Sequence, residues 1–315
     1  MSISENIQGY RQPPGKRSSA ILALSLVSFL WGTTWIVSRQ GVRYVHPLQL
    51  ASIRQTLAGL LYVVYFLFRR ASWPRGKEWW TVLILSLLNF FLTNGLTTWG
   101  VKYISGGLAA IIAAIFPLWL VIIGLLGPPK SKVSPKAMLG FLLGFGGICI
   151  IFYEHLKDFL NKDFRFGIFI SLAASLTWAF GTLYTKQKAA QFNPYFSIGL
   201  QMLISGVLLS GASRLSGAAI PLSSIPWQAW ASIGYLVLFG SVITFFAYLY
   251  ALQYLPTGQV SIYAYINPVV AVLLDTIIFR EKMTIYIALG GMVTLYGVYL
   301  VNESFKTKKT ADQRV

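Results

Sequence analysis

The stretch Trp99–Pro117 reads WGVKYISGGLAAIIAAIFP, and its pattern returns 151 positions later in Tyr250–Pro268, as YALQYLPTGQVSIYAYINP. Six of the 19 aligned positions are identical. Each copy joins two apolar segments through a short polar corner and ends in a proline within the second segment. A proline inside an apolar helix is unusual, because it removes a backbone hydrogen bond and clashes with the preceding turn. Two such prolines in register indicate one structural unit that is used twice.

The composition excludes a soluble protein. The chain has 315 residues, of which 56% are hydrophobic and 11% charged, with a mean hydropathy of +0.63. Soluble domains carry about 25% charged residues. The net charge of +17 comes from basic residues in short loops between apolar segments. A nucleic-acid binder would gather them on one soluble face. We therefore predict an all-α integral membrane protein whose partner is the lipid bilayer and not a nucleic acid.

The apolar segments predict ten transmembrane helices, since about 20 apolar residues cross a bilayer as a helix. They cover residues 18–39, 48–69, 79–99, 104–126, 136–154, 165–186, 195–214, 228–250, 259–279 and 284–302. The predicted divisions are an N-terminal tail at 1–17, a first five-helix unit at 18–154, a connecting loop at 155–164, a second unit at 165–302 and a tail at 303–315.

The distribution of Lys and Arg predicts the orientation, because cytoplasmic loops of membrane proteins are enriched in both. With the N-terminus in the cytoplasm, the cytoplasmic segments hold 16 of the 26 basic residues, the outer segments hold nine, and Arg54 lies inside the membrane. We therefore expect a multi-pass protein of a plasma membrane, such as a bacterial inner membrane, with both termini in the cytoplasm.

The repeat extends beyond the opening stretch. Trp31–Thr34 (WGTT) matches Trp178–Gly181 (WAFG) at an offset of 147. Further matched pairs are Pro47/Pro194 at the same offset, Thr93/Thr244 at 151, and Gly140/Gly290 with Gly147/Gly297 at 150. Each copy holds five spans, which is an odd number, so the second copy crosses the membrane in the opposite sense. Such inverted repeats are common in secondary transporters.

These motifs resemble the EamA-type family of the drug/metabolite transporter superfamily. The resemblance rests on Trp31-Gly32, on Pro47 with Arg54, on the run Tyr103…Gly107…Pro117, and on Arg280-Glu281-Lys282 followed by Leu289-Gly290-Gly291. It implies ten helices in two five-helix repeats around a central cavity, lined mainly by spans one, three, four, six, eight and nine. It also implies transport of small metabolites, such as amino acids, without ATP hydrolysis.

The candidate cavity residues are aromatic or uncharged polar side chains on those spans: Trp31, Thr34, Asn94, Trp99, Trp178, Tyr248, Tyr263 and Asn267. Flat rings on a cavity wall stack on apolar substrates and attract ammonium groups. The alternative is that these side chains only pack or hydrogen-bond between helices. Pro117 and Pro268 are candidate hinges, because each leaves a carbonyl without its helical donor.

Two ionisable residues inside spans are possible charge or coupling sites, because an intramembrane charge is costly and needs a partner. Arg54 either binds a substrate carboxylate or gates the cavity, or it anchors span two, which is usually peripheral in this family. Asp275 lies near the outer end of span nine, close to Arg280. It either carries a coupled proton or pairs with a basic residue.

The sequence lacks the motifs that other mechanisms would require. The sequence has no G-x-x-x-x-G-K-[ST] phosphate loop, so ATP is not the direct energy source. We predict no catalytic residues, cofactor or metal site. The predicted function is secondary transport by alternating access, as an exporter of amino acids or related amphipathic metabolites, with a proton or another ion as a possible coupled partner. A passive facilitator or channel, and a membrane-embedded enzyme, are the alternatives, and the choice between monomer and homodimer stays open.

Overall fold

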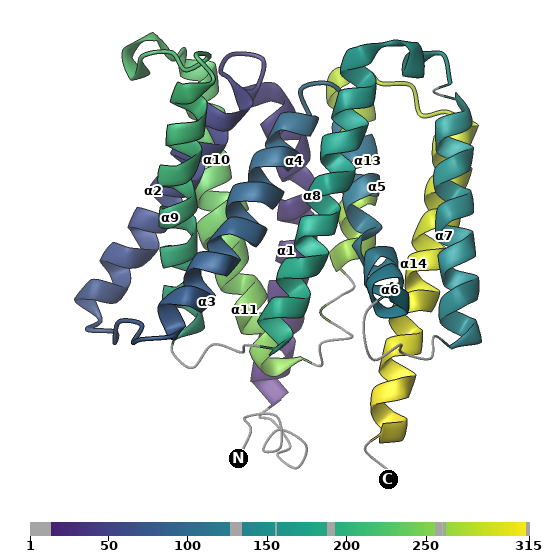
Figure 1. Cartoon of the computed structure of the whole chain (residues 1–315), viewed down its shortest axis with the longest axis horizontal. Coiled ribbons are helices and arrows are strands. Elements are labelled where there is room, and N and C mark those ends of the chain that lie inside the picture. The colour runs from purple at the N-terminus through teal and green to yellow at the C-terminus, as the bar shows by residue number, and fades with distance from the viewer. Residues whose placement is uncertain are drawn as a thin grey trace.

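The structure is a computed structural model that describes residues 14–126, 134–154, 156–187, 193–255, 260 and 263–312. All regular structure in these residues is helical, and the helices form one bundle (Figure 1). The main helices are α1 (Pro14–Gly41), α2 (Pro47–Phe68), α3 (Glu78–Leu85), η1 (Ser86–Asn94), α4 (Gly95–Gly100), α5 (Gly106–Ala114), α6 (Phe116–Leu126), α7 (Pro135–Glu154), α8 (Lys162–Gln187), α9 (Pro194–Leu215), α10 (Trp227–Val237), η4 (Leu238–Ile243), α11 (Thr244–Tyr254), α13 (Tyr263–Phe279) and α14 (Ile285–Asp312).

Eight helical stretches of the described chain are long and apolar enough to cross a membrane, and they coincide with the first eight predicted spans. The shorter apolar helices Tyr263–Phe279 and Ile285–Val301 fall on the ninth and tenth. Large apolar side chains point outward from the bundle, among them Phe169 (68% exposed) and Ile277 (72% exposed). Extended apolar surface of this kind marks a membrane-embedded protein. The chain is therefore a multi-pass membrane protein.

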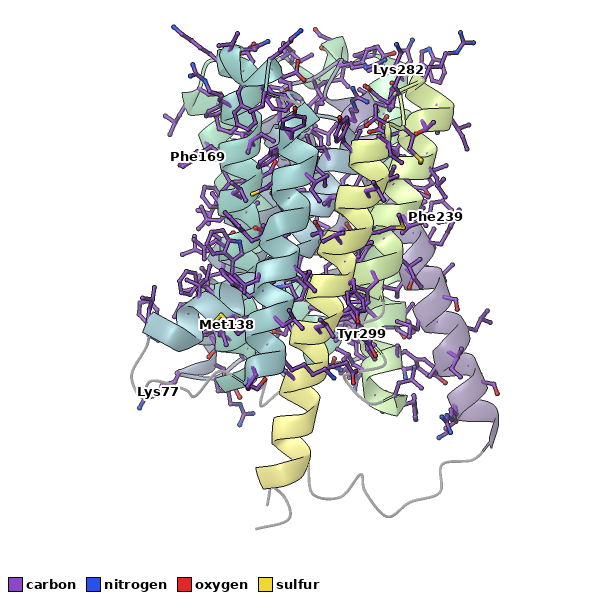
Figure 2. The ribbon with its side chains drawn as sticks, turned by 90° about the vertical axis from the view of Figure 1, so that its right-hand side faces the viewer. Lys77, Met138, Phe169, Phe239, Lys282 and Tyr299 are labelled. Carbon is purple, nitrogen blue, oxygen red and sulfur yellow. The ribbon has the colours of Figure 1, made fainter. Side chains whose placement is uncertain are left out.

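Both ends of the described chain lie at one end of the bundle, where α1 begins and α14 ends (Figure 1). We call this the terminal end and the other the opposite end. Lys282, in the connection between α13 and α14, lies at the opposite end in Figure 2.

Two π-helical segments interrupt the third and eighth predicted spans. Segment η1 connects α3 to α4, and η4 connects α10 to α11. In η1 the hydroxyl of Thr93 donates to the carbonyl of Leu88 at 2.7 Å. The hydroxyl of Thr244, the first residue of α11, donates to the carbonyl of Phe239 in η4. Each bond reaches back five residues. Thr244 and Phe239 follow Thr93 and Leu88 by 151 positions, which is the offset of the sequence repeat in these spans. Such π segments are frequent at functional sites.

Two pairs of helices pack with their backbones in contact. Along the α2–α9 seam, a methyl group added to Gly59 would lie 2.5 Å from the backbone nitrogen of Leu203, and one added to Gly206 would lie 2.6 Å from that of Thr56. Helices α7 and α14 meet in the same way and lie side by side on one face of the bundle (Figures 1 and 2). The small residues along these seams allow a close approach that larger side chains would prevent.

The two candidate hinge prolines have different surroundings. The helix breaks at Ile115, just before Pro117, so the fourth predicted span consists of α5 and α6. The amide of Leu118 donates to the carbonyl of Ile115 at 2.7 Å and closes this tight turn. Pro268 instead lies inside α13, which continues through it. The two copies of the repeated stretch therefore differ at the proline.

Candidate functional site

A cavity of about 160 Å³ lies inside the bundle. Its wall is formed by α1, α2, η1, α4, α5, α6, α8, α11 and α13. On α1 the lining residues run from Trp31 to Ser38, in the half of that helix nearer the opposite end. The cavity is thus displaced from the middle of α1 toward the opposite end.

Most of the sequence-predicted candidates lie in this wall. The lining includes Trp31, Thr34, Asn94, Trp178, Tyr263 and Asn267, together with Arg54 and Pro268. Four candidates lie elsewhere: Trp99, Tyr248, Pro117 and Asp275. The helices that carry the wall are those of spans one, three, four, six, eight and nine, with Arg54 added from span two.

Tyr248 packs behind the cavity in an aromatic cluster. Its ring centroid lies 5.3 Å from that of Trp31 and 5.7 Å from that of Tyr263, and the rings of Trp31 and Tyr263 are 4.9 Å apart. The ring of Phe245 packs edge-on against Trp31 at 5.2 Å. Trp31 and Tyr263 are the lining residues of α1 and α13 nearest the terminal end. This aromatic cluster therefore borders the cavity on that side.

Trp99 lies in α4 near the opposite end of the bundle, outside the cavity wall. Its ring packs edge-on against His46, at 5.8 Å, and against Phe166, at 5.4 Å. Its indole nitrogen is buried without a hydrogen-bond partner in the described residues. Burial and the nearby charge of Lys102 lower the pKa of His46. Trp99 thus joins the loop before α2 to the start of α8.

Trp35 was not among the candidates, although it stands one helical turn after Trp31 on α1. Its indole nitrogen donates to the side-chain oxygen of Asn267 at 2.9 Å, which joins α1 to α13 across the cavity wall. The four-residue spacing from Trp31 was the signal that could have identified it. With its oxygen engaged, Asn267 still has its amide nitrogen for a ligand.

Arg54 reaches the cavity from α2 and is 7% exposed. Its Nε donates to the hydroxyl of Ser241 at 3.0 Å, and its Nη2 donates to the carbonyl of Gly240 at 3.2 Å. Both acceptors belong to η4. The indole of Trp31 donates to the same Gly240 carbonyl at 3.3 Å. No Asp or Glu is among the described residues that line the cavity.

Asp275 is engaged in an ion pair at the opposite end. Its Oδ1 accepts from Nη1 of Arg39 at 2.8 Å, and its Oδ2 accepts from the backbone amide of Gly107 at 2.8 Å. Arg39 also donates from Nη2 to Glu281 at 2.6 Å. The partner is thus Arg39 on α1, and not the neighbouring Arg280. This network joins α1, α5 and α13.

A membrane-embedded helical bundle around a polar and aromatic cavity is an architecture suited to moving a small solute across a bilayer. The sequence model described as "EamA-like transporter family" matches residues 18–153 and 165–303, and the chain belongs to this family. It is therefore a membrane transporter in the general sense that the family defines.

Curated relatives carry descriptions of the same kind. The chain is 27% identical over 306 residues to an uncharacterized transporter of Bacillus subtilis, YvbV, with 96% of each chain covered. It is 30% identical over 283 residues to an uncharacterized inner membrane transporter of Escherichia coli, YedA, with 89% of each covered. One solved structure, titled only as the crystal structure of a protein, matches with a TM-score of 0.62 at 18% identity, covering 90% of this chain and 97% of that one. This likeness concerns the fold.

Proposed function

We propose that the protein is a secondary transporter that exports small amphipathic metabolites, such as amino acids or related compounds, by alternating access. The observation that carries the proposal is the cavity, whose wall combines Trp31 and Trp178 with the amides of Asn94 and Asn267. Rings hold an apolar body, and amides orient a polar group. Trp31 and Trp178 occupy matched positions in the two sequence repeats, so both halves of the chain contribute to the wall.

We further propose ten membrane-spanning helices in two inverted repeats. The contacts at the seams support a two-fold relation between the halves. Gly59 meets Leu203, and Gly206, its counterpart at an offset of 147, meets Thr56, the counterpart of Leu203. Such exchanged contacts are the mark of two-fold symmetry. The matched π segments η1 and η4, and the two separate stretches of the family match, support the same proposal.

Alternating access requires a closure on each side of the cavity, and two features are suited to this role. The aromatic cluster of Trp31, Tyr248 and Tyr263 lies on the side of the terminal end. The ion pair of Arg39 and Asp275 lies toward the opposite end. Both features join α1 to α13 or α11, so a small rotation of α1 would open one and close the other. Pro117 and Pro268 are the proposed hinges.

The remaining parts of the proposal rest on the distribution of basic residues in the loops and on the descriptions of the relatives. The terminal end faces the cytoplasm, the membrane is a bacterial inner membrane, and transport is coupled to a proton or another ion. YedA is described as an inner membrane transporter. Asp275 could take part in coupling only after its two donors, Arg39 and the amide of Gly107, are released.

The test is transport of labelled metabolites in proteoliposomes, with proton and sodium gradients imposed independently. We expect accumulation against a concentration gradient under at least one ion gradient. Trp178→Ala should reduce the rate by about tenfold or more, because loss of the apolar contact of a large wall side chain costs about 1.5–3 kcal/mol. Trp227→Ala, at a position 74% exposed on the surface, is the matched control and should leave the rate unchanged. Simple equilibration under every gradient would identify a passive facilitator instead.

A further inference from the structure

We infer that the cavity takes a monocarboxylate anion with one apolar or aromatic body, and that Arg54 binds the carboxylate. This inference rests on the proposed transport function and specifies its substrate. Within the amphipathic metabolites of that proposal, it favours carboxylates that carry no ammonium group over the amino acids themselves.

The first observation is the incomplete bonding of Arg54. A guanidinium has five N–H donors and no acceptor. Two of them are used, one on Ser241 and one on Gly240, and no hydrogen bond of Nη1 is found among the described residues. The residue lines the cavity. The guanidinium therefore presents free donors to whatever occupies the cavity, and carboxylates match its planar fork.

The second observation is the charge of the wall. Arg54 contributes one positive charge, and no acidic residue is found in the described lining. Asp275 lies outside the lining, and both of its oxygens already accept hydrogen bonds from Arg39 and Gly107. An unpaired charge inside a membrane protein is costly, so an incoming anion is favoured and an incoming cation is opposed. A zwitterion would pair its carboxylate with Arg54 but leave its ammonium without a counter-charge.

The third observation is the size and character of the remaining wall. The volume of about 160 Å³ is similar to that of an engineered apolar cavity of about 150 Å³ that holds one benzene molecule. Trp31, Trp35, Trp178 and Phe116 supply ring surface to this volume. The cavity therefore suits one ring or an aliphatic body of similar size next to the carboxylate.

A purely structural role for Arg54 is the competing explanation. Its two hydrogen bonds join α2 to η4, so the side chain could serve only to hold these elements together. The two explanations differ in what they predict for ligands of different charge. A structural anchor has no preference among ligand charges, whereas a carboxylate-binding residue does.

The decisive experiment measures the affinity of the purified full-length protein in detergent for three probes with the same phenylethyl body. They are 3-phenylpropionate, which is an anion, phenylalanine, which is a zwitterion, and 2-phenylethylamine, which is a cation. Binding is followed by tryptophan fluorescence, since the wall contains three tryptophans. We expect 3-phenylpropionate to bind at least about tenfold more tightly than the other two, the effect of one unpaired charge-bearing group. Equal or tighter binding of either other probe, or no saturable binding of 3-phenylpropionate, overturns the inference.

Substitutions of Arg54 test whether this residue causes the preference for the anionic probe. Arg54→Gln should weaken 3-phenylpropionate binding by about 10- to 100-fold, because a charge-assisted hydrogen bond is lost, and should not weaken 2-phenylethylamine binding. Arg54→Lys should restore part of the affinity. Arg165→Gln, at an exposed position in the first turn of α8, is the matched control. An equal loss for all probes would favour the structural anchor. If Arg54→Gln does not fold, the ranking of the three probes on the natural protein still decides.

This experiment separates the inference from the proposed function, because binding does not require transport. Binding with the predicted preference but no flux in proteoliposomes would refute the transport proposal alone. Flux of a cationic or zwitterionic solute, with no preference for the carboxylate, would refute the present inference and leave the transporter intact.

Discussion

The seam between α7 and α14 allows a prediction in which two adjacent glycines respond oppositely to the same substitution. In Gly147→Ala the new methyl carbon would lie 2.5 Å from the carbonyl oxygen of Gly290 and 2.5 Å from the backbone nitrogen of Thr294. Ordinary contacts of such a carbon are 3.4–4 Å. The side-chain hydroxyl of Thr294 lies at least as close and can rotate away. The two backbone atoms cannot, so the helices must separate by about 1 Å to restore normal contact distances.

The expected cost follows from this separation. Overpacking of a tightly packed interface costs about 1–3 kcal/mol, so Gly147→Ala should lower the free energy of unfolding by that amount. In Gly146→Ala the methyl carbon meets nothing within 4 Å. A Gly-to-Ala change inside a helix is favourable by up to about 1 kcal/mol, so this variant should be neutral or slightly more stable.

The assay is reversible unfolding in detergent micelles, by heat or by added denaturing detergent, on the natural protein and both variants. The neighbouring glycines on α14 offer an independent repetition. An added methyl at Gly290 would lie 2.6 Å from the carbonyl oxygen of Gly147, whereas one at Gly291 has only a side-chain methyl of Ile111 at 3.8 Å. If Gly146→Ala and Gly147→Ala change stability equally, or in the reverse order, the described α7–α14 packing is wrong.

Further predictions concern the cavity and its ion pair. Asp275→Asn should lower the free energy of unfolding by about 1–3 kcal/mol, because the amide can accept from only one of its two donors, Arg39 or the Gly107 amide, and faces the other with its own hydrogens. The pH dependence of transport should match that of the natural protein; loss of that dependence would identify Asp275 as the coupling carboxylate. Asn267→Leu removes the acceptor of the Trp35 indole and should shift the transported solutes toward less polar ones in a competition assay. An unchanged ranking of competitors would show that Asn267 does not determine selectivity.

The transmembrane helices and the composition of the cavity wall were accessible to sequence reasoning, because apolar length and the positions of aromatic and polar residues are properties of the sequence itself. Trp31 and Trp178 were selected by their matched positions in the repeat, and both lie in the wall. Asn267 was selected by the adjoining proline, and it lines the cavity as well.

The partners of the charged residues were not accessible in the same way. The distance in sequence between Arg39 and Asp275 is 236 residues, and only the packing of α1 against α13 brings them together. Arg54 was expected on a peripheral span, yet its long side chain reaches the cavity. The π segments also escaped prediction, because hydropathy does not distinguish a five-residue hydrogen-bond step from a four-residue one. The paired Thr93 and Thr244 were visible as matched residues without revealing what their hydroxyls bind.

The positive charge that Arg54 adds to the described cavity wall has a consequence for the energetics of the transport cycle. Moving one elementary charge across a potential of 100 mV changes the free energy by about 2.3 kcal/mol. A bound monocarboxylate would cancel this charge, so the loaded cavity would reorient as a neutral unit, while the empty cavity would carry its charge through part of the electric field. The membrane voltage would then act on the return of the empty protein, and the electrical polarity of the cell would determine which way the unloaded cavity faces at rest.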